Sequence, residues 1–585
     1  MILDPMADPI LLLTSRLQAA FDTVEPGADP VLRPSDRADY QVNGTLPLAK
    51  RVGRNPRDVA ADILAVADLD GICQVVEIAG PGFVNLTLTD GFVAEQLAAQ
   101  STDPRLGVRL ATMPERVVVD YSAPNTAKEM HVGHLRSTIL GDALARVLEH
   151  VGHTVIRENH VGDWGLQFGM LIEHLVDVGE AEAAAELSTG DLTAFYQQAK
   201  RSFDGDDAFK ERARQRVVLL QSGDTETRRM WHVLVEQSAS YFQLVYDRLE
   251  VLLRPEDSRG ESAYNGMLAA IVDDLAAAGL LVESDGALCA FPPGFLGREG
   301  EPQPLIVKNR NGGFGYGATD LATVRDRVQR QRATWLVYVV GAPQAHHLAM
   351  VWKVCEMAGW LVPPARAVHV PFGSVLGEDR KMYRTRSGES IKLTDLLDEA
   401  VQRAEAAIAE KNPSISGDER AAVARAVGIG AVKYADLSND RIKDYVFSFD
   451  RMVAFEGNTG PYLQYAHARM RKILRDAGPS ADELAHELAG VVPSLAEPQE
   501  RALAMALFGL DAAVHDTIDK LGPHRLCTYL FDLAQTFTAF YEACAVLKPG
   551  VPDVLRRSRL ALCDHTARVL ATGLGLLGIT APERM

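Results

Sequence analysis

Apolar and polar positions divide this chain into three parts with different periodicities. Residues 1–108 combine an apolar leading helix with short strands at 75–78 and 83–88, and the second strand alternates apolar and polar residues. A helix mixed with half-exposed strands predicts a separate N-terminal α+β domain over residues 1–108.

The middle part opens with a strand, a helix and a second strand. The β-branched and aromatic run at 117–121 predicts a buried parallel strand. Apolar residues then recur every four positions, as in one face of a helix: Leu135, Ile139, Ala143, Val147 and Val151. Gly152 ends this helix, and residues 154–156 suit the next strand. The order is typical of a parallel α/β sheet.

The same sheet is expected to resume after a long insertion. Residues from about 179 to 250 are helical in pattern and highly charged, which predicts a helical insertion between two halves of one sheet. The apolar run at 335–340, a helix at 346–359 and a strand at 367–370 would complete the sheet. We expect one α/β domain over residues 109–400. The glycine-rich stretch at 312–317 lacks a Gly-Lys-Ser/Thr ending and is interpreted as a flexible turn.

The last part is helical almost throughout. From Leu393 onward the sequence is rich in alanine and leucine, and prolines mark the connections between helices. We therefore expect an all-α bundle over residues 401–585.

Composition indicates a soluble globular protein. The 585 residues are 47% hydrophobic and 24% charged, and no apolar run approaches the length of a membrane span. The N-terminus lacks the basic start of a secretory signal. Six cysteines without a CxxC pair suit reduced thiols in a cytosol. We expect a cytoplasmic monomer that has no membrane partner.

The formal charge of −18 restricts how nucleic acid could bind. Affinity for phosphate backbones comes mainly from Lys and Arg, so an RNA partner must meet local basic clusters. Such clusters occur at 200–216, 325–332, 469–475 and 556–559. For any single cluster, a solvated helix face is the more common explanation.

Two histidines, His131 and His134, flank Gly133 in the segment between the expected strand at 117–121 and the helix that follows it. Free backbone N–H groups and the positive end of the helix dipole suit phosphate oxygens there, and Gly133 leaves room for an adenine ring. A zinc site would need a third ligand at short spacing, which the sequence does not supply. Two unrelated helix histidines are the other alternative, against which Pro124, Asn125 and Lys128 weigh.

Several motifs together resemble one enzyme family. The stretch Ser122-Ala-Pro-Asn-Thr-Ala-Lys-Glu-Met-His-Val-Gly-His134 and the region 159–165 closely resemble arginyl-tRNA synthetases, which are class I aminoacyl-tRNA synthetases. Residues 381–388 and 392–400 look like the second class I signature in its bacterial arginyl form. Residues 39–41 and 80–85 are similar to the N-terminal domain of the family, and 458–469 and 532–537 to its helical anticodon-binding domain.

The resemblance implies a Rossmann-like class I catalytic domain that uses ATP with Mg²⁺. In such an enzyme the arginine carboxylate attacks the α-phosphate of ATP and pyrophosphate leaves, so positioning and charge neutralisation dominate. His131, Gly133 and His134 would hold the nucleotide, and Lys128 would add a fixed charge. Arg384 stands where the signature normally has its lysine, with Lys381 at the start of the loop, so the cation that meets pyrophosphate stays open.

Recognition of arginine requires carboxylates that match a planar guanidinium with five donors. The motif match assigns Glu261 and Asp320 to this task, and Tyr316 adds a hydroxyl. Asn125 and Gln344 fit the family positions for the α-amino end. Without the signatures, a surface position for Glu261 and helix capping by Asp320 would be the simpler explanations.

The second half-reaction would pass the arginyl group to the terminal adenosine of tRNA(Arg). Phe83 and Asn85 resemble residues that read a base of the tRNA D-loop. Tyr462, Tyr465 and Arg469 could touch the anticodon stem. An ordinary exposed strand, and core or solvated helix positions, are the alternatives.

Two rival functions stay open from sequence alone. One is a different class I synthetase or a nucleotidyltransferase with the same His-x-Gly-His motif. The paired acids Glu261 and Asp320 argue against it. The other is a catalytically silent paralogue that only binds tRNA or a protein, against which the intact motif with Lys128 speaks.

Overall fold

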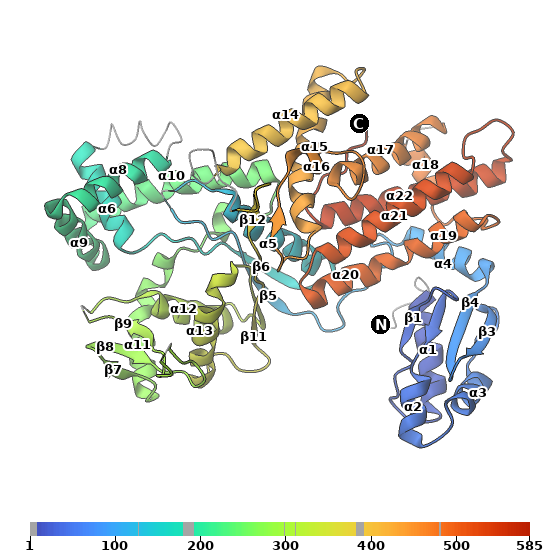
Figure 1. Cartoon of the computed structure of the whole chain (residues 1–585), viewed down its shortest axis with the longest axis horizontal. Helices are drawn as coiled ribbons and strands as arrows, with labels where there is room; N and C mark the ends of the chain where they lie inside the picture. Colours follow the sequence, from blue (N-terminus) through green and yellow to red (C-terminus); the bar gives the residue numbers. More distant parts are fainter. Residues whose placement is uncertain are drawn as a thin grey trace.

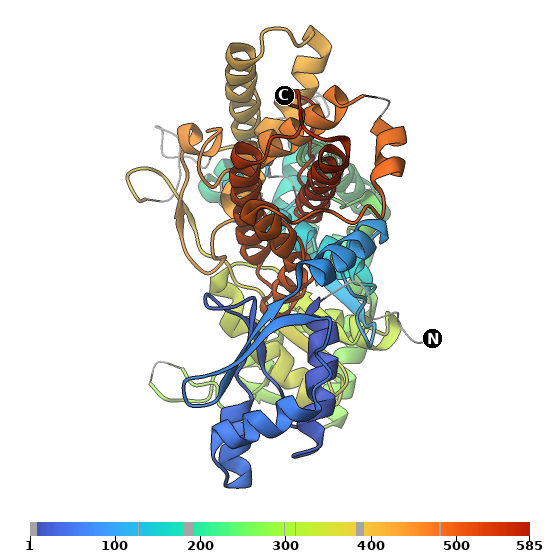
Figure 2. The same cartoon turned by 90° about the vertical axis from the view of Figure 1, so that its right-hand side faces the viewer.

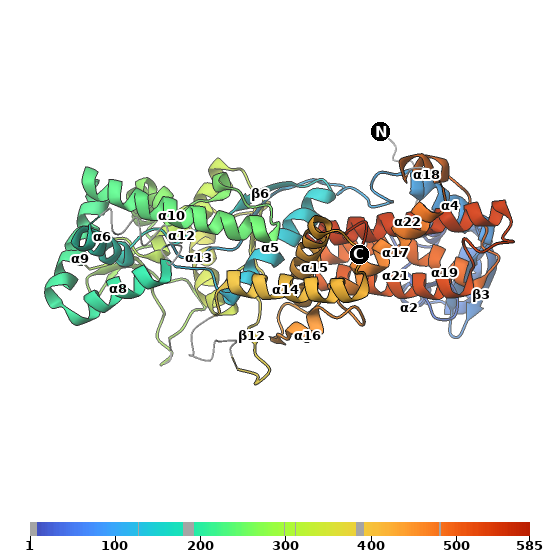
Figure 3. The same ribbon diagram turned by 90° about the horizontal axis from the view of Figure 1, so that it is seen from above.

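The computed structural model describes residues 9–126, 128–179, 192–297, 299–310, 312–381, 391–478 and 481–585. The molecule is elongated, and a helical insertion and the N-terminal domain lie at opposite ends of its long axis (Figure 1). Seen from above, the C-terminal helices run along this axis (Figure 3). No helix of the described ranges is long and apolar enough to cross a membrane.

The N-terminal domain packs helices on an antiparallel sheet of order β1-β2-β4-β3. Its elements are α1 (Pro9–Asp22), β1 (Leu32–Pro34), β2 (Tyr40–Val42), α2 (Thr45–Val52), α3 (Pro56–Val66), β3 (Cys73–Ala79), β4 (Phe83–Leu88) and α4 (Asp90–Thr102). Asn55 begins α3 by accepting a hydrogen bond from the Arg57 backbone, with Pro56 at the first helical position. The domain lies below the C-terminal helices when viewed end-on (Figure 2).

The central sheet is parallel, with order β11-β10-β5-β6. Its strands are β5 (Arg116–Asp120), β6 (Thr154–Glu158), β10 (Trp335–Tyr338) and β11 (Arg366–His369), and its crossover helices include α5 (Val132–His150) and α13 (Ala345–Met357). Val118 on the central strand β5 is fully buried between two neighbouring strands. The chain leaves β5 toward one edge and β10 toward the other, so a topological switch point lies between them.

The insertion after β6 is a helical unit with its own apolar core. Its helices are α6 (Leu166–Val178), α8 (Leu192–Gly205), α9 (Asp207–Ser222) and α10 (Thr225–Leu249). Phe168, Phe195 and Phe209 are buried together in that core. Because α6 begins at Leu166, the helical unit starts earlier than the expected residue 179.

A second subdomain precedes β10 and has a separate core. It contains η1 (Pro255–Asp257), η2 (Glu261–Met267), α11 (Leu268–Ala277), β7 (Val282–Ser284), β8 (Ala287–Ala290), β9 (Leu305–Lys308), α12 (Tyr316–Arg325) and the π-helical η3 (Asp326–Arg330). The glycine-rich stretch at 312–317 is only partly a turn, because Tyr316 and Gly317 already belong to α12. The short η4 (Ala342–Gln344) follows β10.

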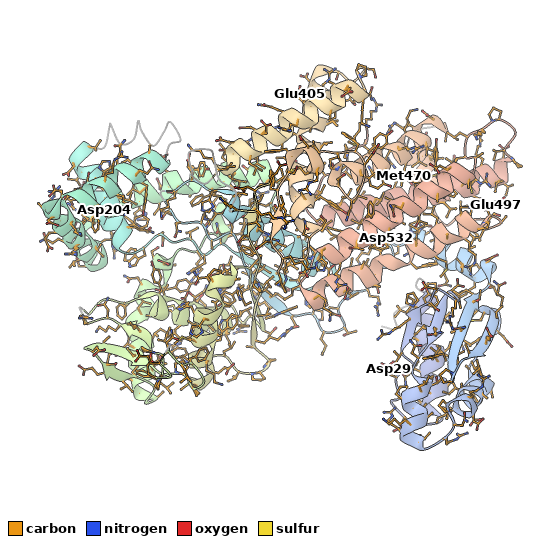
Figure 4. All side chains as sticks on the ribbon, in the orientation of Figure 1. Asp29, Asp204, Glu405, Met470, Glu497 and Asp532 are labelled. Atoms are coloured by element: carbon orange, nitrogen blue, oxygen red, sulfur yellow. The ribbon has the colours of Figure 1, made fainter. Side chains whose placement is uncertain are left out.

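The C-terminal part is helical apart from β13 (Tyr445–Val446), which pairs in parallel with β12 (Val375–Leu376). The helices are α14 (Leu393–Lys411), α15 (Gly417–Leu437), α16 (Phe449–Met452), α17 (Gly460–Asp476), α18 (Ala481–Leu488), α19 (Pro498–Leu507), α20 (Gly509–Lys520), α21 (His524–Ala543) and α22 (Asp553–Leu576). Figure 4 shows Met470 on α17 and Asp532 on α21 within this bundle.

Candidate active site

A cavity of about 780 Å³ opens at the carboxyl ends of β5 and β10, beside the switch point. Eight of the residues assigned by sequence to nucleotide or arginine binding line it together: Asn125, His131, Gly133, His134, Glu261, Tyr316, Asp320 and Gln344. The nucleotide motif and the acidic residues are therefore parts of one site, although Glu261 and Asp320 follow His131 by 130 and 189 residues in the chain.

The turn that follows β5 has an unusual backbone. Ser122 and Ala123 have φ angles of 73° and 45°, in the left-handed region that side chains disfavour. Two hydrogen bonds hold this turn: the Ser122 N–H donates to Ser137 Oγ at 2.9 Å in a buried bond, and the Ala123 N–H donates to Asn159 Oδ1 at 3.0 Å in a partly buried one. The strained turn directs the chain away from the sheet and into the start of α5.

His131 and His134 form a reciprocal cap at the start of α5. The Gly133 N–H donates to Nδ1 of His131 at 3.0 Å, and the His131 N–H donates to Nδ1 of His134 at 3.2 Å. Because each Nδ1 accepts a hydrogen bond, each ring carries its proton on Nε2. The pair therefore offers two neutral N–H donors, with ring centroids 4.0 Å apart.

The pKa values of both histidines favour this neutral state. Burial, and then the charge of Lys128, lowers the pKa of His131. Burial, with the neighbouring His131 and Lys128, lowers the pKa of His134 to about 3. Near neutral pH both imidazoles are uncharged, so they bind anions as hydrogen-bond donors and not as cations.

Asn125 and two glycines fit the loops around the cavity closely. Asn125 forms a parallel bridge with Gly162, at which a Cβ atom would lie 2.6 Å from Oδ1 of Asn125. A Cβ atom at Gly133 would lie 2.8 Å from Cε1 of His131. A side chain at either position would displace Asn125 or His131 from its place in the cavity wall, so glycine suits both positions.

The far end of the cavity is acidic. Burial, and then the charges of Asp320 and Asp163, raises the pKa of Glu261 to about 8. Among the described residues, no cation lies within ion-pair distance of Glu261. Asp163 is held beside it by Ser262, whose hydroxyl and N–H donate at 2.6 and 2.9 Å. Such an uncompensated cluster of acids favours a cationic ligand.

Asp320 and Tyr316 lie one turn apart on α12. Nε2 of His347, on α13, lies 2.5 Å from Oδ2 of Asp320. The side chain of Tyr316 is 72% exposed at the mouth of the cavity. Burial, and then Glu261 and Asp320, raises the pKa of the Tyr316 hydroxyl, which stays protonated as a donor.

Three buried polar atoms of the cavity residues have no hydrogen-bond partner among the described residues. They are Nδ1 of His160 and, at the last residues of β5 and β10, Oδ1 of Asp120 and the hydroxyl of Tyr338. The other oxygen of Asp120 accepts a hydrogen bond from Arg327 at 2.7 Å. Buried groups of this kind normally bind a ligand or water.

The predicted cations do not line this cavity. Nζ of Lys128 lies 4.2 Å from the ring centroid of Tyr196 in the helical insertion. Lys381 is exposed at the end of the segment after β12, and Arg384 lies outside the described residues.

The predicted RNA-contacting residues lie on other domains. Phe83 is half-buried at the start of β4, and Asn85 is 7% exposed and accepts a hydrogen bond from Gln41 at 2.8 Å. On α17, Tyr465 is exposed, whereas the Tyr462 ring packs on Phe531.

Arg469, also on α17, lies with its guanidinium 4.2 Å from the ring centroid of Tyr541. This contact leaves its charge at a partly exposed aromatic surface of the bundle.

Four titratable residues of the cavity were not predicted from the sequence: Asp120, His160, Tyr338 and His347. Asp120 and Tyr338 could have been predicted, because they are the last residues of neighbouring parallel strands, and such residues face the crevice at a switch point. His347 lies in the first turn of α13, after β10, and no local pattern marks it. Among the described residues, no group of three His, Cys, Asp or Glu side chains could hold a metal ion.

Models of known families match almost the whole chain. The N-terminal domain of arginyl tRNA synthetase matches residues 12–88, the catalytic domain of tRNA synthetases class I (R) matches 99–449, and the DALR anticodon binding domain matches 463–585. The catalytic-domain match spans more than half of the chain, so the chain has the fold of a class I tRNA synthetase.

Relatives agree over the full length. An arginine–tRNA ligase of Thermobifida fusca is 54% identical, covering 99% of this chain and 100% of the relative, and one of Frankia casuarinae is 50% identical, covering 97% of each. The structure of the Thermus thermophilus arginyl-tRNA synthetase superimposes with a TM-score of 0.81 at 27% identity, covering 98% of this chain and 99% of that one. The chain belongs to the arginyl-tRNA synthetase family, which confirms the resemblance and the fold class predicted from its motifs.

Proposed function

We propose that this chain ligates L-arginine to tRNA(Arg) for protein synthesis. ATP supplies the energy through an arginyl-adenylate, and AMP and pyrophosphate are released. The observation that carries the proposal is the single cavity in which the His131–His134 turn meets Glu261 and Asp320. Full-length similarity to arginine–tRNA ligases supports the same reaction.

The nucleotide end consists of the start of α5. The Nε2–H groups of His131 and His134 donate to phosphate oxygens, and Gly133 lets the adenosine approach the backbone. A carboxylate oxygen of arginine attacks the α-phosphorus, and the bond from this phosphorus to the pyrophosphate oxygen breaks. The two histidines stabilise the charge that develops on the phosphate as neutral donors.

Pyrophosphate needs positive charge as it leaves. Lys128, Lys381 and Arg384 are the proposed cations, and Mg²⁺ accompanies ATP, bound chiefly by its phosphates. Lys128 is half-buried over Tyr196 and would have to leave that ring to reach the phosphates. This movement would link the helical insertion to the activation step.

The arginine end consists of the acids on η2 and α12. Glu261 and Asp320 bind the guanidinium, with the Tyr316 hydroxyl beside them, and Asn125 and Gln344 hold the α-amino end. A guanidinium is always charged and satisfies several carboxylate oxygens at once, which a smaller ammonium group cannot do in the same geometry.

Transfer to tRNA uses the flanking domains. The 2′-hydroxyl of the terminal adenosine attacks the arginyl carbonyl, and AMP leaves. Phe83 and Asn85 are proposed to read the D-loop, whereas Tyr462, Tyr465 and Arg469 contact the anticodon stem. The exposed Tyr465 ring and the Arg469 guanidinium over Tyr541 are suited to RNA stacking and backbone contact.

We further propose that the enzyme acts as a monomer in the cytoplasm, and that its domains span residues 1–108, 109–400 and 401–585. Size-exclusion chromatography with light scattering tests the assembly state.

Arginine-dependent exchange of labelled pyrophosphate into ATP, measured with and without tRNA(Arg), tests the activity. Exchange with arginine and not with the other amino acids supports the proposal. A lack of exchange under both conditions would refute it, and tRNA binding without adenylate formation would favour a silent paralogue.

A further inference from the structure

The acidic end of the cavity contains one basic side chain that contacts an acid directly. Nε2 of His347 lies 2.5 Å from Oδ2 of Asp320, and the two side chains are 33% and 27% exposed. His347 is in the first turn of α13 and Asp320 is in α12, so the contact joins two helices across the cavity. The other oxygen of Asp320 stays available to a ligand.

Acids outnumber bases around this contact. The titratable groups around His347 and Asp320 come from the neighbouring elements: Glu261 on η2, His160 and Asp163 after β6, Tyr316 on α12, Tyr338 and Asp120 at the strand ends, Arg327 on η3 beside them, and Cys355 on α13. Apart from the histidines and Arg327, none of these groups is a base, and Arg327 pairs with Asp120. Before a cationic ligand arrives, protons are the charges that compensate Asp320 and Glu261.

We propose that His347 is a positioning residue of the arginine pocket, which holds Oδ2 of Asp320, leaves Oδ1 to the guanidinium, and gives up a proton when the guanidinium binds. The inference rests on the proposed function, because it assumes that arginine occupies this pocket. Nε2–H donates to Asp320 before and after binding, so the proton leaves from Nδ1.

The charges of the pocket require this exchange. A guanidinium cannot lose its proton, so the protein groups must adjust when it enters. Asp320 then has a permanent cation as its partner, and a positive imidazolium beside it becomes unfavourable. The start of α13 adds to this effect, because the positive end of the helix dipole disfavours a cation in its first turn.

The pKa shifts of His347 and Glu261 agree with proton release when the guanidinium binds. The hydrogen bond to Asp320 raises the pKa of His347 against the effect of burial. Burial and the nearby carboxylates raise the pKa of Glu261 to about 8. In the pH range where His347 and Glu261 carry protons, arginine binding therefore displaces these protons to solvent, and arginine binds more tightly as pH rises.

Three substitutions separate this role from a general effect on folding. His347→Gln keeps an N–H donor for Asp320 and removes the titration, whereas His347→Ala removes both. His346→Gln is the matched control, because His346 lies on the same helical turn, is exposed, and contacts Gln303 at 2.8 Å in place of Asp320.

The measurement is kcat and KM for arginine and for ATP in aminoacylation, between about pH 6 and pH 9. We expect His347→Ala to raise KM for arginine roughly tenfold or more and to leave KM for ATP within about twofold, as for the loss of a charged hydrogen bond. His347→Gln should restore KM to within about threefold of wild type and weaken its pH dependence. His346→Gln should behave as wild type.

Binding of arginine can also be followed without turnover. Calorimetry in two buffers with different heats of ionisation should show net proton release by the wild-type protein, and less by His347→Gln. Equal proton release by both proteins would overturn the inference. So would an unchanged KM for arginine in His347→Ala, or an equal rise of KM for arginine and ATP.

Failure of the proposed function gives a different result from failure of the role of His347. A wild-type protein that charges tRNA with another amino acid, or with none, overturns both proposals. A wild-type protein that charges arginine while His347→Ala has an unchanged KM overturns only the role of His347.

Discussion

Arg136 and Asp436 form a buried ion pair between the helix of the nucleotide end and the C-terminal bundle. Nε of Arg136 lies 3.0 Å from Oδ2 of Asp436, and the side chains are 1% and 0% exposed. Arg136 lies on α5, two residues after His134, whereas Asp436 lies on α15. The pair therefore ties the nucleotide-binding turn to the bundle.

The same guanidinium also holds the segments that lead to the second signature. Nη1 of Arg136 donates to the Gly373 carbonyl at 2.7 Å and to the Lys443 carbonyl at 3.1 Å. These residues precede the paired strands β12 and β13, and Lys381 follows β12 by five residues. One buried side chain thus connects three segments around the nucleotide end.

Replacement of Arg136 by methionine should destabilise the protein strongly. Asp436 would stay buried without its partner, at a cost of about 3–5 kcal/mol in the free energy of unfolding. The double variant Arg136→Met, Asp436→Leu should recover part of this loss, because no charge stays buried. Urea unfolding of the three proteins measures both effects. A loss below about 1 kcal/mol in the single variant would contradict the prediction.

Asp320→Asn should impair use of arginine far more than use of ATP. An amide removes a carboxylate from the guanidinium site, and loss of about 3 kcal/mol corresponds to a fall in kcat/KM for arginine of roughly 100-fold or more. Asp274→Asn is the control, because Asp274 is 49% exposed and pairs with Arg325 outside the cavity. Equal kinetics of the two variants would remove Asp320 from the pocket.

The fold was predictable wherever a periodic pattern ran for several residues. The strands expected at 117–121, 154–156, 335–340 and 367–370 correspond to β5, β6, β10 and β11 within two residues at each end. Buried strands and amphipathic helices have sequence periods of their own, so local pattern is sufficient for them. The bundle after Leu393 was predictable for the same reason.

Partners across the fold were not predictable in this way. His347 and Asp320 are 27 residues apart, and Arg136 and Asp436 are 300 apart, so no local period links them. Their contacts depend on how the helices pack after the sheet has formed. The motif resemblance assigned Glu261 and Asp320 to the arginine pocket. His347, which contacts Asp320, belongs to no motif.

Gly141→Ala tests the packing of α5 on the strand before it. A Cβ atom at Gly141 would lie 2.2 Å from Cβ of Tyr121, which is fully buried. Overpacking of this kind costs about 1–3 kcal/mol in the free energy of unfolding. Gly91→Ala on α4, where no atom lies within 4 Å, should be neutral or stabilising by up to about 1 kcal/mol. Thermal unfolding of both variants tests this prediction. Equal melting temperatures of Gly141→Ala and Gly91→Ala would refute the packing argument.

Glu158 should make stability depend on pH in the acidic range. Burial raises its pKa, but the charge and hydrogen bonds of Arg327, with Gln331 and Tyr264, outweigh burial and lower the pKa from 4.5 to about 2. Its stabilising contribution is present above pH 4.5 and is lost as pH falls toward 2. The shift corresponds to about 3 kcal/mol.

Glu158→Gln should therefore lower the free energy of unfolding at pH 7 and flatten its fall between about pH 5 and pH 3. Urea unfolding at several pH values measures the slope. Glu149→Gln provides the comparison, because Glu149 pairs with Arg157 nearer the surface. A steeper fall in Glu158→Gln than in wild type would show that the sign is wrong.

Arg501 should determine how firmly the N-terminal domain is attached to the bundle. From α19 its guanidinium contacts both oxygens of Asp39 at 2.8 and 2.7 Å, Asp90 at 2.8 Å and the Leu88 carbonyl at 3.2 Å. The side chain is only 22% exposed, so these charge-assisted bonds are partly shielded from water. The strand that ends at Leu88 is β4.

Arg501→Ala should loosen this attachment without unfolding either domain. We expect faster limited proteolysis between the domains and a rise in KM for tRNA of roughly three- to tenfold, because β4 carries the proposed D-loop readers Phe83 and Asn85. KM for arginine should not change. Arg51→Ala, which breaks an exposed pair with Glu25 inside the N-terminal domain, is the matched control. If both variants bind tRNA as wild type does, the position of this domain does not depend on Arg501, and the bundle alone provides the affinity for tRNA.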